Sequence, residues 1–264
     1  IYVFVIKIGN CMSDSRLDVL LVERHLASTR TQAQKMIAAG QVKLFEAGVW
    51  RVVTKPSLKL HADVKLDAVL GEEQRYVSRA GLKLEGVLKQ TRVTVKDLVA
   101  LDIGQSTGGF TDCLLQHGCK HVVGVDVGHS QLHESLKNHP QVSYLEGINA
   151  RHLVPEDFPA ETPNVFDIIV MDVSFISQTL ILPQLPELLK NGGYLLSLIK
   201  PQFEVGKKHI GKGGIVKDVN LFADVRERIC GTIEHMGFHI KSYSESSITG
   251  GDGNTEFIVV AQKT

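Results

Sequence analysis

The stretch Asp102-Ile-Gly104-Gln-Ser-Thr-Gly108-Gly109-Phe110 decides the fold of this chain. It joins an apolar segment at residues 98–103, which has the composition of a buried strand, to a helical pattern at residues 110–117. A strand, a glycine-rich turn and a helix in this order open a doubly wound sheet. Ligands of such a sheet bind outside the carboxyl ends of its strands, so this turn is the predicted binding site.

Strand and helix patterns alternate on the C-terminal side of this turn. The expected strands cover residues 121–126, 142–145, 166–172, 194–199, 238–243 and 256–261, and the expected helices cover 180–190 and 217–235. This alternation predicts an α/β domain with a parallel, Rossmann-like sheet. Only a loop joins the last two strands, so we expect them to pair antiparallel.

The N-terminal part predicts a separate, small α+β domain. Helices are expected at residues 17–22 and 32–39, and short strands at 42–45, 49–53 and 64–66. The polar stretch Gly71-Glu-Glu-Gln74 marks a boundary, which gives domains at 12–70 and 76–264 with a linker at 71–75. Residues 1–11 are left out of the fold prediction because Met12-Ser-Asp-Ser-Arg16 resembles a more usual start.

The net charge of zero hides an uneven distribution. Residues 12–66 carry nine Lys or Arg and five Asp or Glu, whereas residues 67–264 carry 19 basic and 24 acidic residues. A basic front on an acidic body favours a polyanionic partner, although ordinary charge scatter would look similar. Arg16, Arg24, Arg30 and Lys35 fall on the helical part and are the predicted phosphate contacts. A solvated helix face is the alternative.

Several classes of protein are disfavoured by composition. Cys11, Cys113, Cys119 and Cys230 have neither metal nor redox spacing, so we expect no metal site and reduced thiols in a cytoplasmic protein. No apolar run approaches the roughly 20 residues that span a bilayer, so no membrane partner is expected.

The glycine turn favours S-adenosylmethionine as the cofactor. Its spacing, Gly-x-x-x-Gly-Gly, is neither the dinucleotide pattern nor a P-loop, which disfavours a dehydrogenase. Asp102, two residues before the first glycine, suits the amino group of a sulfonium ligand, and Asp126 ends the next strand where ribose hydroxyls would lie. Asn149 is a weaker candidate for the adenine edge. The predicted cofactor residues are Asp102, Gly104, Ser106, Thr107, Gly108, Gly109, Phe110, Asp126, Val127, Asn149 and Asp172.

Four charged residues lie at the edges of apolar segments: Lys83, Asp172, Lys200 and Glu256. If these segments pack as one sheet, the charges converge at its edge. Two amines facing two carboxylates favour proton handling, whereas a structural ion-pair network is the alternative. Phe175 and Phe203 then provide walls that can stack on a base or belong to the core.

The chain resembles the TlyA/haemolysin-A family across residues 16–264, an S-four-type RNA-binding domain fused to an FtsJ-type methyltransferase. The N-terminal match rests on Arg16-Leu-Asp18, Ser28-Thr-Arg30, Ala33, Ile37, Gly40 and Val42. The rest of the match is carried by Tyr76-Val-Ser-Arg-Ala-Gly-Leu-Lys83-Leu, the turn at 102–112, Val125-Asp-Val127, Met171-Asp-Val-Ser-Phe-Ile176, Ile199-Lys-Pro-Gln-Phe-Glu204 and Gly253-Asn-Thr-Glu256. Gln105, Ala80 and His129-Ser130 depart from the family pattern.

The resemblance implies 2′-O-methylation of a cytidine ribose in ribosomal RNA, with a catalytic tetrad that falls on Lys83, Asp172, Lys200 and Glu256. Lys200 would steer and help deprotonate the 2′-oxygen, and burial beside a second amine would lower its pKa while the carboxylates oppose that shift. A non-catalytic ribosome-associated protein and a membrane-lytic haemolysin are the competing interpretations. The basic loop at 206–214 is expected to close over RNA or cofactor, or to be an ordinary solvated loop.

Overall fold

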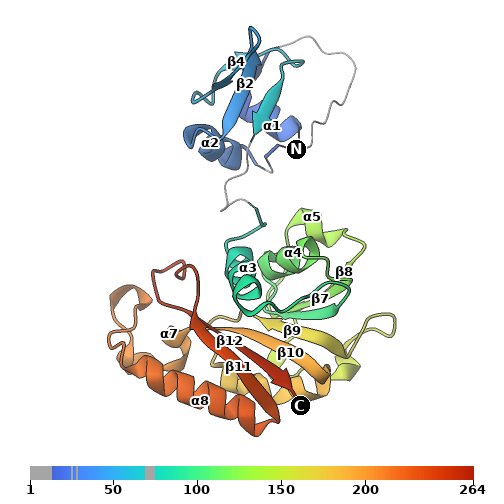
Figure 1. Ribbon diagram of the computed structural model, residues 1–264, viewed down its shortest axis with the longest axis vertical. Helices are drawn as coiled ribbons and strands as arrows, with labels where there is room; N and C mark the ends of the chain where they lie inside the picture. The colour runs from blue at the N-terminus through green and yellow to red at the C-terminus, as the bar shows by residue number, and fades with distance from the viewer. Residues whose placement is uncertain (1–13, 25, 28, 69–74) are drawn as a thin grey trace. The chain divides into compact units, whose positions relative to one another are not determined.

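The computed structural model describes residues 14–24, 26–27, 29–68 and 75–264 (Figure 1). The chain divides into two compact units, Ile1–Glu72 and Glu73–Thr264. The predicted linker at residues 71–75 lies outside the described residues except for Arg75. Each unit has its own apolar core, and each is described below by itself.

The N-terminal unit packs two helices on a three-stranded sheet. Helices α1 (Leu17–Glu23) and α2 (Arg30–Ala38) precede strands β2 (Val42–Glu46), β3 (Val49–Val52) and β5 (Leu66–Ala68), which pair antiparallel in the order β3-β2-β5. A second, two-stranded sheet joins β1 (Ser15–Arg16) to β4 (Lys59–Leu60). The Thr29 side chain accepts a hydrogen bond of 3.1 Å from the Gln32 amide and so caps α2. Leu17, Leu21, Ala33, Met36, Ile37 and Val42 form its fully buried core.

The C-terminal unit is built on a seven-stranded sheet in the order β11-β12-β10-β9-β6-β7-β8. Its strands are β6 (Val99–Ile103), β7 (His121–Asp126), β8 (Val142–Glu146), β9 (Phe166–Met171), β10 (Leu189–Ile199), β11 (Phe238–Glu245) and β12 (Phe257–Lys263). The pairs β6–β7, β7–β8, β6–β9 and β9–β10 are parallel. Strand β12 runs antiparallel to both β10 and β11, which confirms the expected pairing of the last two strands.

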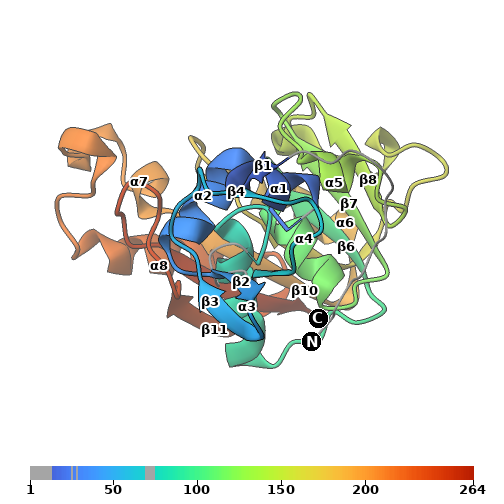
Figure 2. The ribbon, with the colours of Figure 1, turned by 90° about the horizontal axis from the view of Figure 1, so that it is seen from above.

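Helices cover both faces of this sheet. Helices α3 (Ala80–Thr91) and α4 (Gly109–Gln116) pack on one face, where Leu84 and Leu114 meet Ile168 and Val260. Helices α6 (Leu185–Leu188) and α8 (Leu221–His235) pack on the other face, which Figure 1 shows below the strands. Figure 2 shows α5 (Glu134–Lys137) and β8 at one end of this unit and α7 (Pro201–Glu204) at the other. This three-layer arrangement confirms the predicted Rossmann-like sheet.

Three local predictions were wrong. The helix expected at 180–190 is broken into 3-10 turns at Gln178–Leu180 and Leu182–Gln184 and the single turn α6, because Pro183 and Pro186 interrupt it. Helix α8 begins at Leu221, so residues 217–220 are not helical. The apolar segment that carries Lys83 forms helix α3 and does not join the sheet as a strand. Further 3-10 turns are Ala150–His152, Pro155–Asp157, Lys207–His209 and Lys212–Gly214.

Candidate active site

The glycine turn after β6 brings the backbone against the neighbouring strand. Gly104 has φ +81°, and a Cβ built there would lie 2.6 Å from the carbonyl oxygen of Asp172. Gly108 has φ +92°, and its Cβ would lie 2.4 Å from the Leu136 Cδ1 atom. A side chain therefore meets both an unfavourable φ and a close neighbour at each position. The sequence needs glycine here to keep the carboxyl ends of β6 and β9 close together.

Asp102 is a buried carboxyl group inside this turn, with 1% of its surface exposed. Its Oδ2 atom accepts a hydrogen bond of 2.6 Å from Thr111, which in turn accepts one of 2.8 Å from Gln105. Its Oδ1 atom is buried and has no hydrogen-bond partner in the described structure. Burial raises the pKa of Asp102 to about 7, the Thr111 hydrogen bond acts against this, and the charge of Asp172 adds to it.

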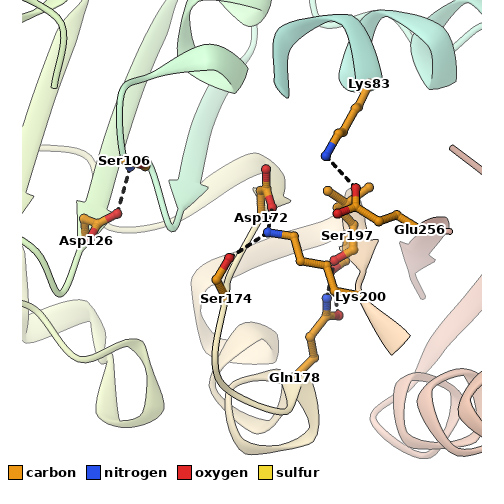
Figure 3. A network of polar contacts seen from close by, with 10 residues as sticks. Lys83, Ser106, Asp126, Asp172, Ser174, Gln178, Ser197, Lys200 and Glu256 are labelled. Carbon is orange, nitrogen blue, oxygen red and sulfur yellow. Dashed lines mark hydrogen bonds and ion pairs between the residues drawn. The ribbon is translucent and has the colours of Figure 1, made fainter. Parts of the chain in front are cut away.

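Asp126 ends β7 and faces the same turn. Its carboxylate accepts a backbone hydrogen bond of 2.8 Å from Ser106 (Figure 3) and another of 2.7 Å from Gly128. The Ser106 hydroxyl also donates to Gln131 at 3.0 Å. A carboxylate has about four acceptor sites, so Asp126 retains capacity for further donors such as ribose hydroxyls.

The four predicted catalytic residues form two close ion pairs. Lys83 Nζ lies 2.5 Å from Glu256 Oε2, and both side chains are at least nine-tenths buried. Lys200 Nζ lies 2.6 Å from Asp172 Oδ1 and donates a hydrogen bond of 2.8 Å to the Ser174 hydroxyl. Asp172 Oδ1 is buried and accepts no hydrogen bond within the described residues, so its contact with Lys200 is an ion pair. Figure 3 shows the pairs on neighbouring elements, with Lys83 reaching down from its helix.

The direction of β12 explains how Glu256 joins this group. Asp172 and Lys200 follow the carboxyl ends of β9 and β10, whereas Glu256 directly precedes β12. Because β12 is antiparallel to β10, its amino end lies at the same edge of the sheet, and Ile199 pairs with Phe257. Residues after two strands and before a third therefore meet at one edge.

Sequence reasoning missed the polar network under the Asp172 loop. The Ser197 hydroxyl donates to Gln178 at 2.7 Å, and buried Glu204 accepts hydrogen bonds from the Ser177 hydroxyl at 2.7 Å and the Gln178 amide at 2.8 Å. These contacts fix the loop that carries Ser174. The one available signal was Ser197 itself, because a serine inside an apolar strand needs a buried partner.

A cleft of about 140 Å³ opens between the glycine turn and Lys200. Most predicted cofactor residues line it: Asp102, Gly104, Ser106, Thr107, Gly109, Phe110 and Asp172. Lys200 of the predicted tetrad lines it as well, together with Ser78, Ala80, Gln105 and Ser174, which were not predicted as cofactor residues. Gly108, Asp126, Val127 and Asn149 do not line it. Val127 is 70% exposed. The Asn149 side chain accepts a hydrogen bond of 3.1 Å from the Arg151 backbone amide and so caps a 3-10 turn.

Phe175 lies beside the cleft in an unusual state for a large apolar side chain. It is 90% exposed, its φ is +64°, and its ring centroid lies 5.0 Å from that of Phe203. A non-glycine residue with positive φ costs free energy, so the surrounding structure holds Phe175 there. This observation favours the interpretation of Phe175 as a wall of the site over that of a core residue.

The basic loop at 206–214 is attached to the segment that carries Glu256. Asn254 is 3% exposed, accepts a hydrogen bond of 3.2 Å from the Val216 amide and donates one of 3.1 Å to the Gly214 carbonyl. Lys207, Lys208 and Lys212 lie in its 3-10 turns. Closure of this loop over RNA stays a prediction.

The predicted RNA-binding residues are partly engaged within the N-terminal unit. Arg16 and Arg30 lie 2.9 and 3.2 Å from the carboxylate of fully buried Asp18, whose pKa the Arg16 hydrogen bond holds far below its usual range. Arg24 donates to the carbonyls of Ala62 and Val64. Lys35 is exposed on α2. Arg16 and Arg30 remain about half exposed, so both can still contact phosphate.

Comparisons with known proteins agree with this geometry. The FtsJ-like methyltransferase model matches residues 76–263, and the S4 domain model matches residues 15–44. The 16S/23S rRNA (cytidine-2′-O)-methyltransferase TlyA of Mycobacterium tuberculosis is 39% identical, over 93% of this chain and 88% of that protein. The chain belongs to the TlyA family of FtsJ-like methyltransferases.

Two further members of this group are similar over nearly all of the chain. YqxC of Bacillus subtilis, named as a candidate rRNA methyltransferase, is 48% identical over 92% of this chain and 84% of its own length. A solved structure from Streptococcus thermophilus, titled as a candidate hemolysin, is 41% identical with a TM-score of 0.69 and covers 96% of this chain and 90% of that one. The similarity to TlyA relatives thus covers both units.

Two absences concern the described residues only. Within residues 14–24, 26–27, 29–68 and 75–264, no helix is long and apolar enough to cross a membrane. In the same part of the chain, no group of three or more His, Cys, Asp or Glu side chains is arranged to hold a metal ion.

Proposed function

We propose that this protein transfers a methyl group from S-adenosylmethionine to the 2′-hydroxyl of a ribose, on a cytidine of ribosomal RNA in the cytoplasm. The observation that carries the proposal is the meeting of the Lys83–Glu256 and Lys200–Asp172 pairs beside the glycine turn. The TlyA relative is named for this reaction, which supports cytidine as the target.

The residues around the cleft fit S-adenosylmethionine. The buried Asp102 Oδ1 atom lacks a partner and can accept from an amino group, and Asp126 retains acceptor capacity for ribose hydroxyls. The glycine turn leaves room where a Cβ would otherwise stand. When bound, S-adenosylmethionine supplies a methyl group on a sulfonium, which is a strong electrophile.

The tetrad would orient the ribose hydroxyl and remove its proton. Lys200 lines the cleft, so its amine can hold the 2′-oxygen, and Asp172 and Ser174 fix its position from two sides. The Lys83–Glu256 pair stands next to it and limits where the ribose can lie. Proton transfer by a positioned side chain contributes about 10²–10⁴-fold, and alignment of the reacting atoms contributes about 7–11 kcal/mol in favourable cases.

RNA binding would come from the N-terminal unit. The S4 match covers residues 15–44, which include Arg16, Arg30 and Lys35, and the cations of these residues can contact phosphates without reading sequence. The 2′-hydroxyl distinguishes RNA from DNA, so the reaction itself requires an RNA substrate.

A labelling experiment tests the proposal with a matched pair of variants. The protein is incubated with tritiated S-adenosylmethionine and ribosomal subunits from a strain that lacks this methylation. We expect label in rRNA as 2′-O-methylcytidine, and a loss of about 10²–10⁴-fold in Lys200→Ala. Lys190→Ala is the control, because Lys190 forms a more exposed ion pair of 2.7 Å with Asp167 at the opposite edge of the sheet, away from the cleft.

Each outcome of this experiment has a clear meaning. Full transfer by Lys200→Ala, with cofactor binding unchanged, would remove Lys200 from the mechanism. No label from the wild-type protein, although it binds cofactor and RNA, would favour a non-catalytic ribosome-associated protein. An equal loss in Lys190→Ala would show that the effect is structural.

A further inference from the structure

The outward face of the β3-β2-β5 sheet carries an exposed aromatic cluster. Phe45 pairs with Trp50 across β2 and β3, and Lys43 pairs with Val52. Successive residues of a strand point to opposite faces, and Val42 and Leu44 point into the core. Phe45 and Trp50 therefore lie on the side of the sheet away from α1 and α2. We call Lys43, Phe45, Trp50, Val52 and Lys65 the sheet patch.

The two aromatic rings of the sheet patch are in contact, and Trp50 is open to solvent while Phe45 is partly buried. Their centroids are 5.1 Å apart at an interplanar angle of 55°, and Trp50 is 49% exposed while Val52 is 54% exposed. Folding alone does not explain large apolar side chains that gather on one exposed face of a small domain. Trp50 also lies on an edge strand, so approach to its ring is open from the side.

Cations flank this pair of rings. Lys65 Nζ lies 5.6 Å from the Phe45 ring centroid, and Lys43 precedes Phe45 by two residues on the same face of β2. Asp67, opposite Lys43, is the acidic neighbour on this face. Residues 14–68 as a whole carry nine Lys or Arg and six Asp or Glu. Aromatic faces with cations on either side match a strand of nucleic acid, in which bases alternate with phosphates. The two lysines favour nucleic acid over a protein partner, because their cations match the phosphates of a nucleic-acid strand.

We propose that the sheet patch binds a single-stranded segment of RNA. An unpaired base stacks on Trp50 and Phe45, and Lys43 and Lys65 contact the phosphates on either side. This contact is separate from the helical surface of Arg16, Arg30 and Lys35, because the sheet patch lies on the opposite side of the sheet from both helices. The inference rests on RNA as the substrate of the proposed function, but it concerns binding and not methyl transfer.

Trp50 makes the proposal directly measurable, because it is the one tryptophan in the chain. Titration of the full-length protein with an unstructured oligoribonucleotide should quench its fluorescence, with N-acetyltryptophanamide as the correction for light absorption by the RNA. A duplex of the same composition should quench much less, since its bases are already stacked. Saturated RNA binding by anisotropy with no change in Trp50 emission would overturn the proposal.

Three variants separate stacking from folding. Trp50→Ala should weaken binding of the labelled oligonucleotide about 5- to 150-fold, and Trp50→Phe should restore most of the affinity. Val49→Ala is the matched control, because Val49 is also 49% exposed and lies next to Trp50, but points to the opposite face. Equal affinity of Trp50→Ala and wild type, or equal losses in Trp50→Ala and Val49→Ala, would contradict the stacking role.

The phosphate contacts have their own measurement. For single strands, the slope of log K against log salt changes by about 0.7 for each phosphate contact that is lost. Lys65→Gln should therefore lower the magnitude of this slope by about that amount, and an unchanged slope would remove Lys65 from the interface. Quenching of Trp50 by RNA-free ribosomal proteins, with none by RNA, would assign the sheet patch to a protein partner and so overturn the proposal.

The binding and labelling experiments fail independently. RNA could quench Trp50 fluorescence and Trp50→Ala could lose RNA affinity while no label enters rRNA. That result would support the sheet patch as an RNA site and reject the methyltransferase activity. Label in rRNA without quenching of Trp50 fluorescence would support the methyltransferase activity and reject the sheet patch as an RNA site.

Discussion

Asp102 is the residue at which the structure adds most to the sequence. The sequence placed a carboxylate before the glycine turn, and the structure shows it buried, with one oxygen bonded to Thr111 and a pKa raised to about 7. A buried acid of this kind costs free energy when it is ionised. Its second oxygen is buried and has no hydrogen-bond partner within the described residues.

The pH dependence of stability should report this burial. Between the unfolded pKa of about 3.9 and the folded pKa of about 7, the folded protein retains a proton on Asp102 that the unfolded chain has released. The contribution of Asp102 to the free energy of unfolding therefore falls as pH rises from about 4 to about 7, and it is constant above that range. In Asp102→Asn this contribution is absent, so the stability of the variant relative to wild type should rise across the same window. Urea unfolding of both proteins at pH 5 to 8 measures it.

Asp167 provides the control for this measurement. Burial acts to raise its pKa, but hydrogen bonds from Lys190 and the Val99 amide prevail and lower it. Its contribution is present above its unfolded pKa and is lost only as pH falls through the lowered folded value. The difference between Asp167→Asn and wild type should thus stay constant from pH 5 to 8. Parallel curves for Asp102→Asn and wild type would contradict the raised pKa.

The residues of the site divide into those that a sequence can show and those that it cannot. Asp172, Lys200 and Glu256 stand at the ends of strong apolar patterns, so their place at the edge of the sheet was predictable. Ser174 was not, because its role depends on a loop whose course Glu204 and Gln178 determine from inside the protein.

At the scale of elements, the glycine turn after β6 supports a sharp test. Gly104→Ala combines a positive φ with a Cβ 2.6 Å from the Asp172 carbonyl, whereas Gly192→Ala has φ +78° and open space around it. Strain of the φ alone costs about 1–3 kcal/mol at either position. We expect Gly104→Ala to lose more stability than Gly192→Ala and to weaken cofactor binding at least about tenfold. Calorimetry with S-adenosylhomocysteine measures the binding, and equal effects of both variants would show that the close approach to Asp172 does not matter.

Element boundaries show where local pattern was insufficient. Strand β7 was predicted at its observed bounds, because four of its six residues are apolar or glycine and turns flank it. The stretch 180–190 has leucines at helical spacing, but its two prolines remove backbone donors and break the helix. No element was predicted for the apolar segment that carries Lys83, and its helix is defined by packing against α4. Tertiary contacts therefore determine the element type and bounds where the periodicity of apolar residues does not.

At the scale of the whole molecule, the two units have separate cores. Residues 75–77 belong to the C-terminal unit, since the Val77 amide donates to Asp112 at 2.8 Å and the Arg75 carbonyl accepts from Gln116 at 3.0 Å. A fragment of residues 73–264 should therefore keep cofactor affinity within about threefold of the full chain and lose at least about tenfold in RNA affinity. Binding of S-adenosylhomocysteine and of labelled RNA measures both. Loss of cofactor binding by a folded fragment would show that the N-terminal unit completes the site.

The sheet order was predictable in part. Alternating strands and helices indicated parallel pairing, and the short connection between the last strands indicated an antiparallel pair. The insertion of β12 between β10 and β11 was not predictable, because no local pattern states which neighbour a strand chooses.

The insertion of β12 between β10 and β11 has a consequence for folding during synthesis of the chain. A ribosome makes the chain from its N-terminus, so the S4 unit emerges before β12. Glu256 reaches Lys83 only once β12 has paired with β10 and β11. A nascent chain therefore contains the whole S4 unit before it can form the Lys83–Glu256 pair, so this edge of the sheet is completed after the N-terminal unit has been made.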